Sequence, residues 1–256
     1  MRHLLPVLLG CCLLNACSTD AKKISPQRPF ASPPPAASEE HAEESLPLSS
    51  LKRRILTVAQ HEWQYFDRQS VIMTEEGDSI PHVGAWEDED GDHAERINLY
   101  WRAVGQPGLD GHDCQQPWSA AFVSWVMQAA GVSSELFPPA GAHWVYLTRI
   151  LSHADTDASF LPHTRQAYSP KSGDLICASR EAYLSPYIEE IPTVDWLESA
   201  KLHCDIVVKK QGRTLEAIGG NVRNSVSRSI LTLSPEGFLQ PTPHRRWFLI
   251  IENRLY

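Results

Sequence analysis

Three polar side chains of this chain have the types that nucleophilic catalysis requires: the hydroxyl of Ser119, the imidazole of His203 and the amide of Asn221. Such catalysis needs a nucleophile, a base within hydrogen-bond reach, and a third group that orients the base. Ser119 begins the apolar segment 119–130, which has the pattern of a buried helix, and His203 begins the strand-like segment 203–208. If the strands pair and this helix packs across them, we expect the three groups to meet.

Ser119 has a catalytic and a structural interpretation. A hydroxyl is far less acidic than a thiol, and a helix N-terminus stabilises an anion by about 2 kcal/mol at most, so the helix alone cannot ionise a serine. His203 would therefore have to take the proton during attack, while helix amides near Ala120 stabilise the oxyanion. The structural alternative is that Ser119 only caps its helix, a role worth about 1 kcal/mol.

The orienting group has two candidates. Asp205 shares a strand face with His203, because side chains alternate along a strand, and it could orient the histidine or remain a solvated charge. Asn221 follows two glycines and could orient the histidine or serve only as a turn residue. His203 itself has a structural alternative, as a strand-edge histidine bonded to a backbone carbonyl.

Trp118, His143 and Arg180 are the candidate binding residues. His143 and Tyr146 lie about one helical turn apart, so they could line a groove or simply pack. Arg180 follows the first strand of the predicted sheet and could hold a substrate carboxylate, although a surface role is the alternative.

The pattern along the chain predicts helices first and strands later. Apolar residues recur at helical spacing in four segments: 51–67, 94–105, 119–130 and 142–153. Five apolar runs bounded by turn residues predict strands: 175–177, 206–208, 214–218, 230–233 and 247–251. This order favours an α+β fold with N-terminal helices packed on an antiparallel sheet of about five strands. The acidic segment 74–92 is expected to be an exposed loop, and 180–202 a long insertion that acts as a lid or binding wall.

The N-terminal region indicates an exported, anchored protein. Residues 1–16 have a charged start and a short apolar run typical of a signal peptide. The small residues before Cys17 are similar to a bacterial lipobox, so Cys17 is the expected lipidation site and Ser18 favours the outer membrane. Residues 17–50 are rich in proline and glutamate, which predicts a disordered tether. The folded domain is then expected to comprise residues 51–256. The alternative is an ordinary secretory signal.

Composition and cysteine count narrow the partners. The formal net charge is −8 and there is no basic run, which argues against nucleic-acid binding. Cys114, Cys177 and Cys204 remain after signal removal, so one of them stays without an intrachain partner among these three. A Cys177–Cys204 bridge requires neighbouring strands, and two buried free thiols are the alternative.

The residues that carry these signals also resemble a known group of enzymes. Segment 118–123 resembles the nucleophile motif of CHAP and NlpC-type cell-wall amidases and peptidases, in which a cysteine stands at the position of Ser119. Segment 173–175 is similar to the turn that enters their first core strand, and His203 resembles their catalytic histidine. Gly220-Asn221 is similar to a glycine-asparagine segment of CHAP domains. Those domains often carry a glutamate at the position that Gly219 occupies here. The resemblance covers about residues 95–252 and implies a papain-like fold.

More closely, the whole chain resembles a bacterial domain-of-unknown-function family numbered 2272, which implies no activity. The resulting expectation is a periplasm-facing, outer-membrane lipoprotein that acts on or binds peptidoglycan. As an amidase or endopeptidase it would use Ser119 and His203 with Asn221 or Asp205, and no metal or organic cofactor. The alternative is an inactive papain-like domain that binds cell-wall peptide or a protein partner.

Overall fold

The helices form where the amphipathic segments of the sequence predict them. The computed structural model describes residues 48–155, 159–180 and 190–256. Four helices cover the predicted segments: α1 (Ser50–Tyr65), α2 (Gly91–Ala103), α3 (Ser119–Ala129) and α4 (His143–Ser152). None of the helices within these described ranges is long and apolar enough to cross a membrane. The predicted signal peptide 1–16, the lipidation site Cys17 and nearly all of the tether lie outside the described residues.

The strands form one eight-stranded mixed sheet with the order β2-β1-β7-β6-β5-β4-β8-β3. Their bounds are β1 (Ser70–Met73), β2 (Asp78–His82), β3 (Phe160–Thr164), β4 (Leu175–Ser179), β5 (Leu202–Gln211), β6 (Thr214–Gly219), β7 (Ser227–Thr232) and β8 (Arg246–Asn253). Neighbouring strands are antiparallel except for the parallel pair β1 and β7. The predicted α+β class is confirmed, whereas the prediction of about five antiparallel strands is wrong in number and in orientation.

The three strands that the sequence did not predict are short, and two of them contain proline. Pro81 lies in β2 and Pro162 lies in β3, and these strands are the two edges of the sheet. Proline has no N–H for a ladder hydrogen bond, so a sheet tolerates it at an edge. The expectation of an exposed loop over 74–92 is therefore wrong for 78–82.

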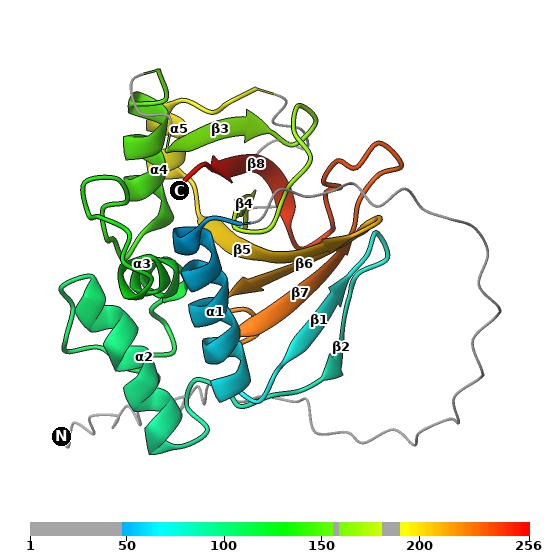
Figure 1. Cartoon of the computed structure of the whole chain (residues 1–256). Coiled ribbons are helices and arrows are strands. Elements are labelled where there is room, and N and C mark those ends of the chain that lie inside the picture. Colours follow the sequence, from blue (N-terminus) through cyan, green and yellow to red (C-terminus); the bar gives the residue numbers. More distant parts are fainter. Residues whose placement is uncertain (1–47, 156–158, 181–189) are drawn as a thin grey trace, which may run out of the picture. The chain divides into compact units, whose positions relative to one another are not determined.

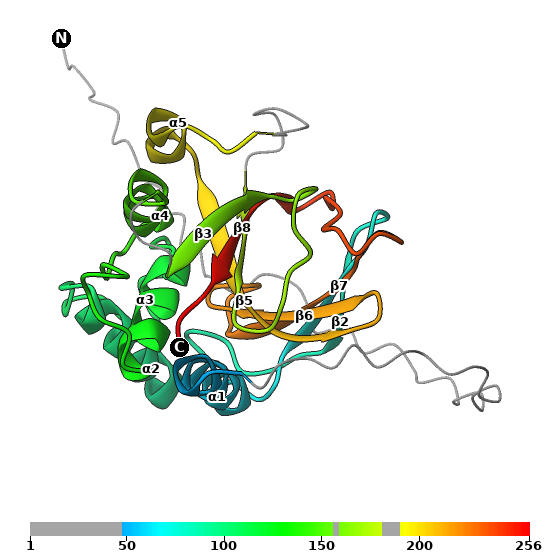
Figure 2. The same ribbon diagram turned by 45° about the horizontal axis from the view of Figure 1, so that its top comes forward.

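The helices α1 to α4 lie together on one side of the sheet, as the two ribbon views show (Figures 1 and 2). Residues on alternate positions of β5 contribute to two apolar clusters. Ile206 belongs to the larger cluster beneath the helices, and Val207 belongs to a second cluster with Ile176 and Trp247 on the other face. Because both faces are covered, β4 and the first part of β5 are buried on both sides.

A disulfide joins β4 to β5 at a position of direct pairing. Cys177 and Cys204 are register partners with Cα atoms 4.1 Å apart, and a disulfide bond links them. The sequence left open whether these two residues are bridged or free, and the neighbouring strands resolve the choice in favour of the bridge.

The turn before β4 ties the sheet to the end of the chain. Gly173 has a φ of 98°, a value that favours glycine. The Asp174 carboxylate accepts hydrogen bonds from the backbone N–H groups of Lys171 (2.8 Å) and Asn253 (2.9 Å). Residues 173–175 thus enter a core strand, as the sequence predicts.

The predicted insertion 180–202 is described only in part, since 181–189 lie outside the described residues. Its second half contains the short helix α5 (Val194–Ser199), which begins at the cap Thr193. The Trp196 ring packs edge-on against Phe248, with ring centroids 5.2 Å apart. This contact anchors α5 on β8, and the lid role of the insertion stays a prediction.

Candidate functional site

Ser119 is the first residue of α3, and its hydroxyl does not cap the helix. The N-cap position belongs to Trp118, and no side chain caps this helix end. The Trp118 ring is buried between Phe66 and Tyr100, and its Nε1 donates to Glu87 Oε2 at 2.5 Å. The capping interpretation of Ser119 is therefore wrong. Trp118 packs in the core and holds the start of α3, and its role as a binding residue stays a prediction.

The hydrogen-bond partner of Ser119 is a histidine that the sequence assigned to binding. His143 Nε2 lies 2.7 Å from Ser119 Oγ, and both side chains are buried. The other ring nitrogen of His143 is hydrogen-bonded to the Tyr146 hydroxyl, one turn along α4. The helical spacing noted in the sequence thus produces a chain of three groups, Tyr146, His143 and Ser119.

Burial keeps the members of this chain neutral. Desolvation lowers the pKa of His143 well below its ordinary value, and electrostatic interactions with His203, Arg180 and Arg245 lower it further. Desolvation also raises the pKa of Tyr146 well above its ordinary value. A neutral imidazole has one ring nitrogen that accepts a hydrogen bond, so His143 has the protonation state of a general base.

His203 forms a second pair with Asp205. Its Nε2 lies 2.6 Å from Asp205 Oδ1, and Ser229 Oγ donates to Asp205 Oδ2 at 3.1 Å. The centroids of the His203 and His143 rings are 5.8 Å apart, so the two pairs belong to one cluster. A carboxylate at Nε2 fixes a proton on that nitrogen and leaves Nδ1 as the acceptor of a neutral ring.

The electrostatics of the second pair favour a charged carboxylate and a neutral ring. Desolvation lowers the pKa of His203, although the neighbouring Asp205 opposes this effect. Desolvation alone would raise the pKa of Asp205. His203, its hydrogen bond, Arg245 and Ser229 together outweigh desolvation and lower it. Asp205 is thus the single buried anion of the four side chains Ser119, His143, His203 and Asp205.

Two glycines at the end of β6 make room for this cluster. A Cβ atom on Gly219 would lie 1.7 Å from Asp205 Oδ1 and 3.3 Å from His203 Nε2. A Cβ atom on Gly220 would lie 2.5 Å from the Cβ of Phe122 and 2.6 Å from the Trp118 ring. The first glycine therefore admits the carboxylate, and the second lets the start of α3 approach the sheet.

The structure brings together some of the predicted site residues and separates others. Ser119, His143, His203 and Asp205 share one cluster, but Ser119 is bonded to His143 rather than to the predicted base, His203. Asn221 adopts a left-handed backbone conformation in a turn, with a φ of 55°. No hydrogen bond joins it to His203 among the described residues, and Asp205 orients that ring instead.

The basic side chains near the cluster come from the ends of two strands. Arg180 follows β4, as predicted, and is exposed. Arg245 immediately precedes β8, and no pattern in the sequence indicates a role for it. The charges of both lower the pKa values of His143 and His203.

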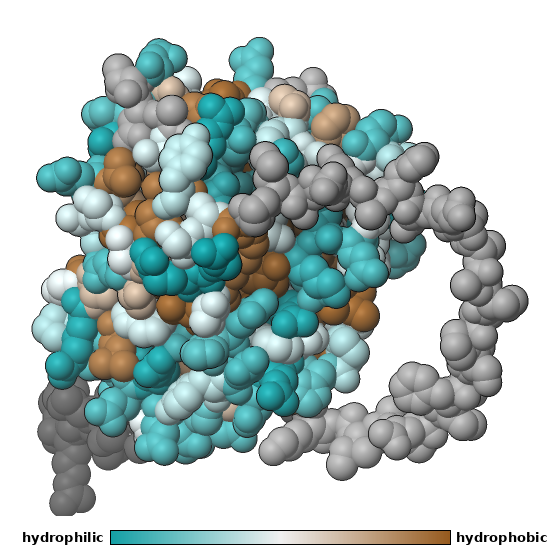
Figure 3. Space-filling view, viewed as in Figure 1, coloured by the Kyte–Doolittle hydropathy of each residue, from teal (hydrophilic) through white to brown (hydrophobic). Residues whose placement is uncertain are grey.

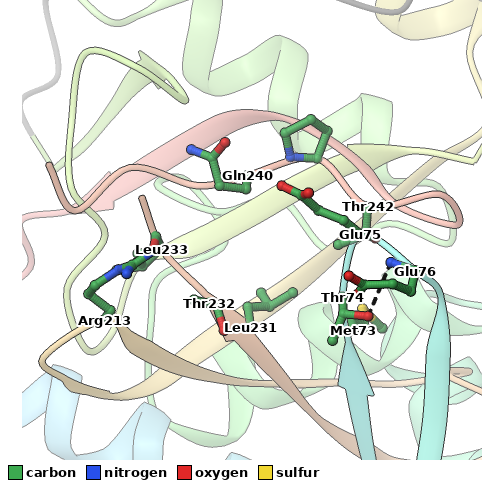
Figure 4. A pocket seen from close by; sticks show the side chains of 11 residues that line it. Met73, Thr74, Glu75, Glu76, Arg213, Leu231, Thr232, Leu233, Gln240 and Thr242 are labelled. Carbon is green, nitrogen blue, oxygen red and sulfur yellow. Dashed lines mark hydrogen bonds between the residues drawn. The ribbon is translucent and has the colours of Figure 1, made fainter. Parts of the chain in front are cut away.

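A pocket outside the cluster lies elsewhere on the sheet. It is lined by residues of the β1–β2 hairpin and of β7 together with segment 240–242, and it contains none of the four cluster residues (Figure 4). The acidic side chains of Glu75 and Glu76 and the guanidinium of Arg213 border it. Within the described ranges, no group of three or more His, Cys, Asp or Glu side chains is arranged to hold a metal ion.

Comparison with known proteins identifies the family. Residues 85–251 match the family DUF2272, described as "Uncharacterized protein conserved in bacteria", so the chain belongs to that family. The matched range includes Ser119, His143, His203 and Asp205, so the complete cluster lies within the family domain. No curated protein and no solved structure matches the chain.

Proposed function

We propose that this protein is a serine hydrolase of cell-wall peptides with a papain-like domain, held at the outer membrane by lipid on Cys17 and facing the periplasm. The observation that carries the proposal is the 2.7 Å hydrogen bond between Ser119 Oγ and His143 Nε2 at the start of a buried helix. A hydroxyl bonded to a neutral imidazole is the arrangement by which serine enzymes generate a nucleophile.

The order of elements supports the papain-like assignment. The nucleophile begins a helix, and His203, a histidine oriented by a carboxylate, follows on a strand. The departure from that pattern is that the residue bonded to Ser119 is His143 of α4. In CHAP domains, which this chain resembles, a glutamate is common at the position of Gly219. Here the Asp205 carboxylate from the adjacent strand fills the space of a side chain at that position. Asp205 thus puts a negative charge where the glutamate of CHAP domains would put one.

In the proposed reaction, Ser119 Oγ attacks the carbonyl carbon of a peptide amide while His143 Nε2 accepts the hydroxyl proton. His143 then gives this proton to the amine nitrogen as the C–N bond breaks, leaving an ester on Ser119. Water attacks the ester by the same route and releases the acid. The first backbone bond of α3 joins Phe122 N–H to Trp118 C=O, so the earlier N–H of Ala120 can serve the oxyanion.

This test uses the purified full chain and insoluble peptidoglycan, with released fragments identified by mass spectrometry. We expect release by the wild-type protein, loss of release in Ser119→Ala, and retention in Ser119→Cys. Ser124→Ala is the matched control, because Ser124 is a buried serine of the same helix whose hydroxyl bonds only the backbone of Ala140. Release that persists in Ser119→Ala would contradict the proposal.

A second function, binding without cleavage, is favoured by the burial of the cluster. Ser119 is 2% exposed, His143 5% and His203 1%, so a substrate reaches the hydroxyl only if the covering residues move. A buried polar network of this kind can also serve only to specify the fold. Retention of the chain on insoluble peptidoglycan without fragment release would support this function, and neither retention nor release would exclude both.

A further inference from the structure

The register of three adjacent strands places two arginines on the same face of the sheet as His203. His203 pairs with Ala178 on β4, and Ala178 pairs with Trp247 on β8. Arg180 lies two residues beyond Ala178, and Arg245 lies two residues before Trp247. Because side chains alternate along a strand, both arginines lie on the same sheet face as His203, Ala178 and Trp247. They lie about 7 Å further along the strands than these three residues.

Backbone bonds confirm that the two ends lie side by side. Ser179 and Arg246 are register partners, so the next step along β4 and β8 brings Arg180 opposite Arg245. The Arg180 N–H donates to Lys201 C=O at 2.8 Å, which continues the pairing of β4 with β5 past the end of the strand. Arg180 is therefore held in line with the sheet even though its side chain is exposed.

Neither guanidinium has a carboxylate partner among the described residues. Arg245 Nε is buried and has no hydrogen-bond partner there, and Arg245 Nη1 makes only a long contact with the His244 carbonyl, at 3.4 Å. By contrast, Arg96, Arg223, Arg228 and Arg254 each form an ion pair with an acidic residue. The Nε atoms of Arg228 and Arg246 also have no hydrogen-bond partner in the described ranges, but Arg228 carries an ion pair through Nη1. A buried donor without an acceptor costs free energy, so Arg245 Nε is free to donate to a bound acceptor.

The two positive charges act on each other and on the catalytic cluster. Desolvation lowers the pKa of Arg245, the Asp205 carboxylate opposes this effect, and the Arg180 charge adds to it. Two guanidinium groups that repel each other are stabilised by an anion placed between them. The Asp205 carboxylate is already engaged by His203 and Ser229, so it is not that anion.

We propose that Arg180 and Arg245 form a carboxylate-binding subsite one step along the sheet from His203, so that the protein selects peptides with a free carboxylate near the bond to be cut. A guanidinium presents parallel N–H donors that match the two oxygens of a carboxylate, which a lysine cannot reproduce. The identity of the bond to be cut rests on the proposed function, whereas carboxylate binding by the two arginines is measured without hydrolysis. The face of the molecule in Figure 3 mixes hydrophilic and hydrophobic residues.

The test compares two probes on the full chain carrying Ser119→Ala, which removes hydrolysis during titration. The probes are N-acetyl-L-alanyl-D-glutamate and its diamide, which differ only in charge and in the carboxylate oxygens. We expect calorimetry to show at least about tenfold tighter binding of the free acid. Arg180→Gln and Arg245→Gln should each remove most of this preference, and Arg245→Lys should restore only part of it.

Arg254→Gln is the matched control, because it removes the same charge from an exposed arginine that is paired with Glu252 and follows the opposite end of β8 from Arg245. The preference should survive in this variant. If Arg245→Gln does not fold, the exposed Arg180→Gln still decides the question. Equal affinity for the two probes, binding of neither probe, or an unchanged preference in Arg180→Gln would overturn the inference. Selective binding by a wild-type chain that releases no fragments would overturn the proposed hydrolase and leave the subsite intact.

Discussion

Asp205 Oδ1 lies 1.7 Å from the position that a Cβ atom on Gly219 would occupy. The two residues face each other across β5 and β6, next to the register pair Ile206 and Ile218. Only a glycine at 219 leaves room for the carboxylate that holds His203. The glycine is therefore part of the site, although it has no chemistry of its own.

This relationship predicts a strong coupling between positions 219 and 205. Gly219→Ala should destabilise the protein by about 1–3 kcal/mol, because the added methyl group displaces a buried carboxylate. In an Asp205→Ala background most of this cost should disappear, since the clashing atoms are gone. Urea unfolding of both single variants and the double variant measures the coupling energy.

Gly108→Ala is the control for this cycle, since a Cβ atom at 108 meets nothing within 4 Å. Its effect should be the same in the wild-type and Asp205→Ala backgrounds. Additive effects of Gly219→Ala and Asp205→Ala would show that the carboxylate does not occupy this space.

A second prediction concerns which histidine is the base. His143→Gln should lower hydrolysis by about 10²–10⁴-fold, because it removes the ring that is bonded to Ser119. His203→Gln should lower the rate less, because His203 is hydrogen-bonded to Asp205, whereas the partner of Ser119 is His143. Single-turnover rates with a soluble stem peptide separate the two effects.

His163→Gln provides the matched control, because His163 also bonds a carboxylate, that of Glu252, but lies on the edge strand β3. It should leave the rate unchanged. A larger loss in His203→Gln than in His143→Gln would restore the assignment that the sequence favoured.

The sequence predicted the members of this cluster better than their partners. Ser119 was found from the apolar helix that it begins, and Asp205 from the two-residue period that places it on the face of His203. The pairing of Ser119 with His143 depends on the angle at which α4 crosses α3, and no local pattern encodes that angle. The spacing of His143 and Tyr146 was the only signal, and it is equally typical of packing.

The same distinction explains the fold. Helices and long strands follow from the periodicity of their own residues, so α1 to α4 and the core strands were predicted. The strands β1, β2 and β3 have four or five residues each, and their pairing depends on partners distant in sequence, such as β7 and β8. Arg245 was missed for the same reason, because its position beside Arg180 depends on strand order.

A third prediction concerns the pH dependence of hydrolysis. The lowered pKa of His143 means that the ring stays neutral, and able to accept the Ser119 proton, below its ordinary pKa of 6.5. We therefore expect kcat/KM to remain constant as the pH falls through 6.5, where an ordinary histidine becomes half protonated. A profile that loses half its value at pH 6.5 would contradict the burial of this ring in the active protein.

A fourth prediction concerns the bridge between β4 and β5. Replacing both Cys177 and Cys204 with alanine should lower the free energy of unfolding by about 2–5 kcal/mol, mainly because the unfolded chain loses a constraint. Urea unfolding measures this loss. Digestion of the unreduced wild-type protein should give the two cysteine peptides as one joined species in the mass spectrum. Separate peptides with alkylated thiols would show that the strands pair without the bridge.

The fifth prediction follows from the pKa of Asp174. Burial raises it from the ordinary 3.8 to about 6, although hydrogen bonds from Asn253 and Lys171 oppose the shift. A raised pKa means that the folded state binds the proton more tightly than the unfolded state. The resulting stabilisation is complete below pH 3.8 and is lost as the pH rises through 6. A difference of about two pKa units corresponds to about 3 kcal/mol.

Asp174→Asn removes this titration and keeps the shape of the side chain. The free energy of unfolding of the wild-type protein should therefore fall relative to that of Asp174→Asn by about 3 kcal/mol between pH 4 and pH 7. Thermal or urea unfolding at several pH values measures the difference. If the wild-type protein instead gains stability over the variant with rising pH, the two backbone N–H donors outweigh burial. Asp174 would then be a charged anchor for the turn into β4 and the end of β8.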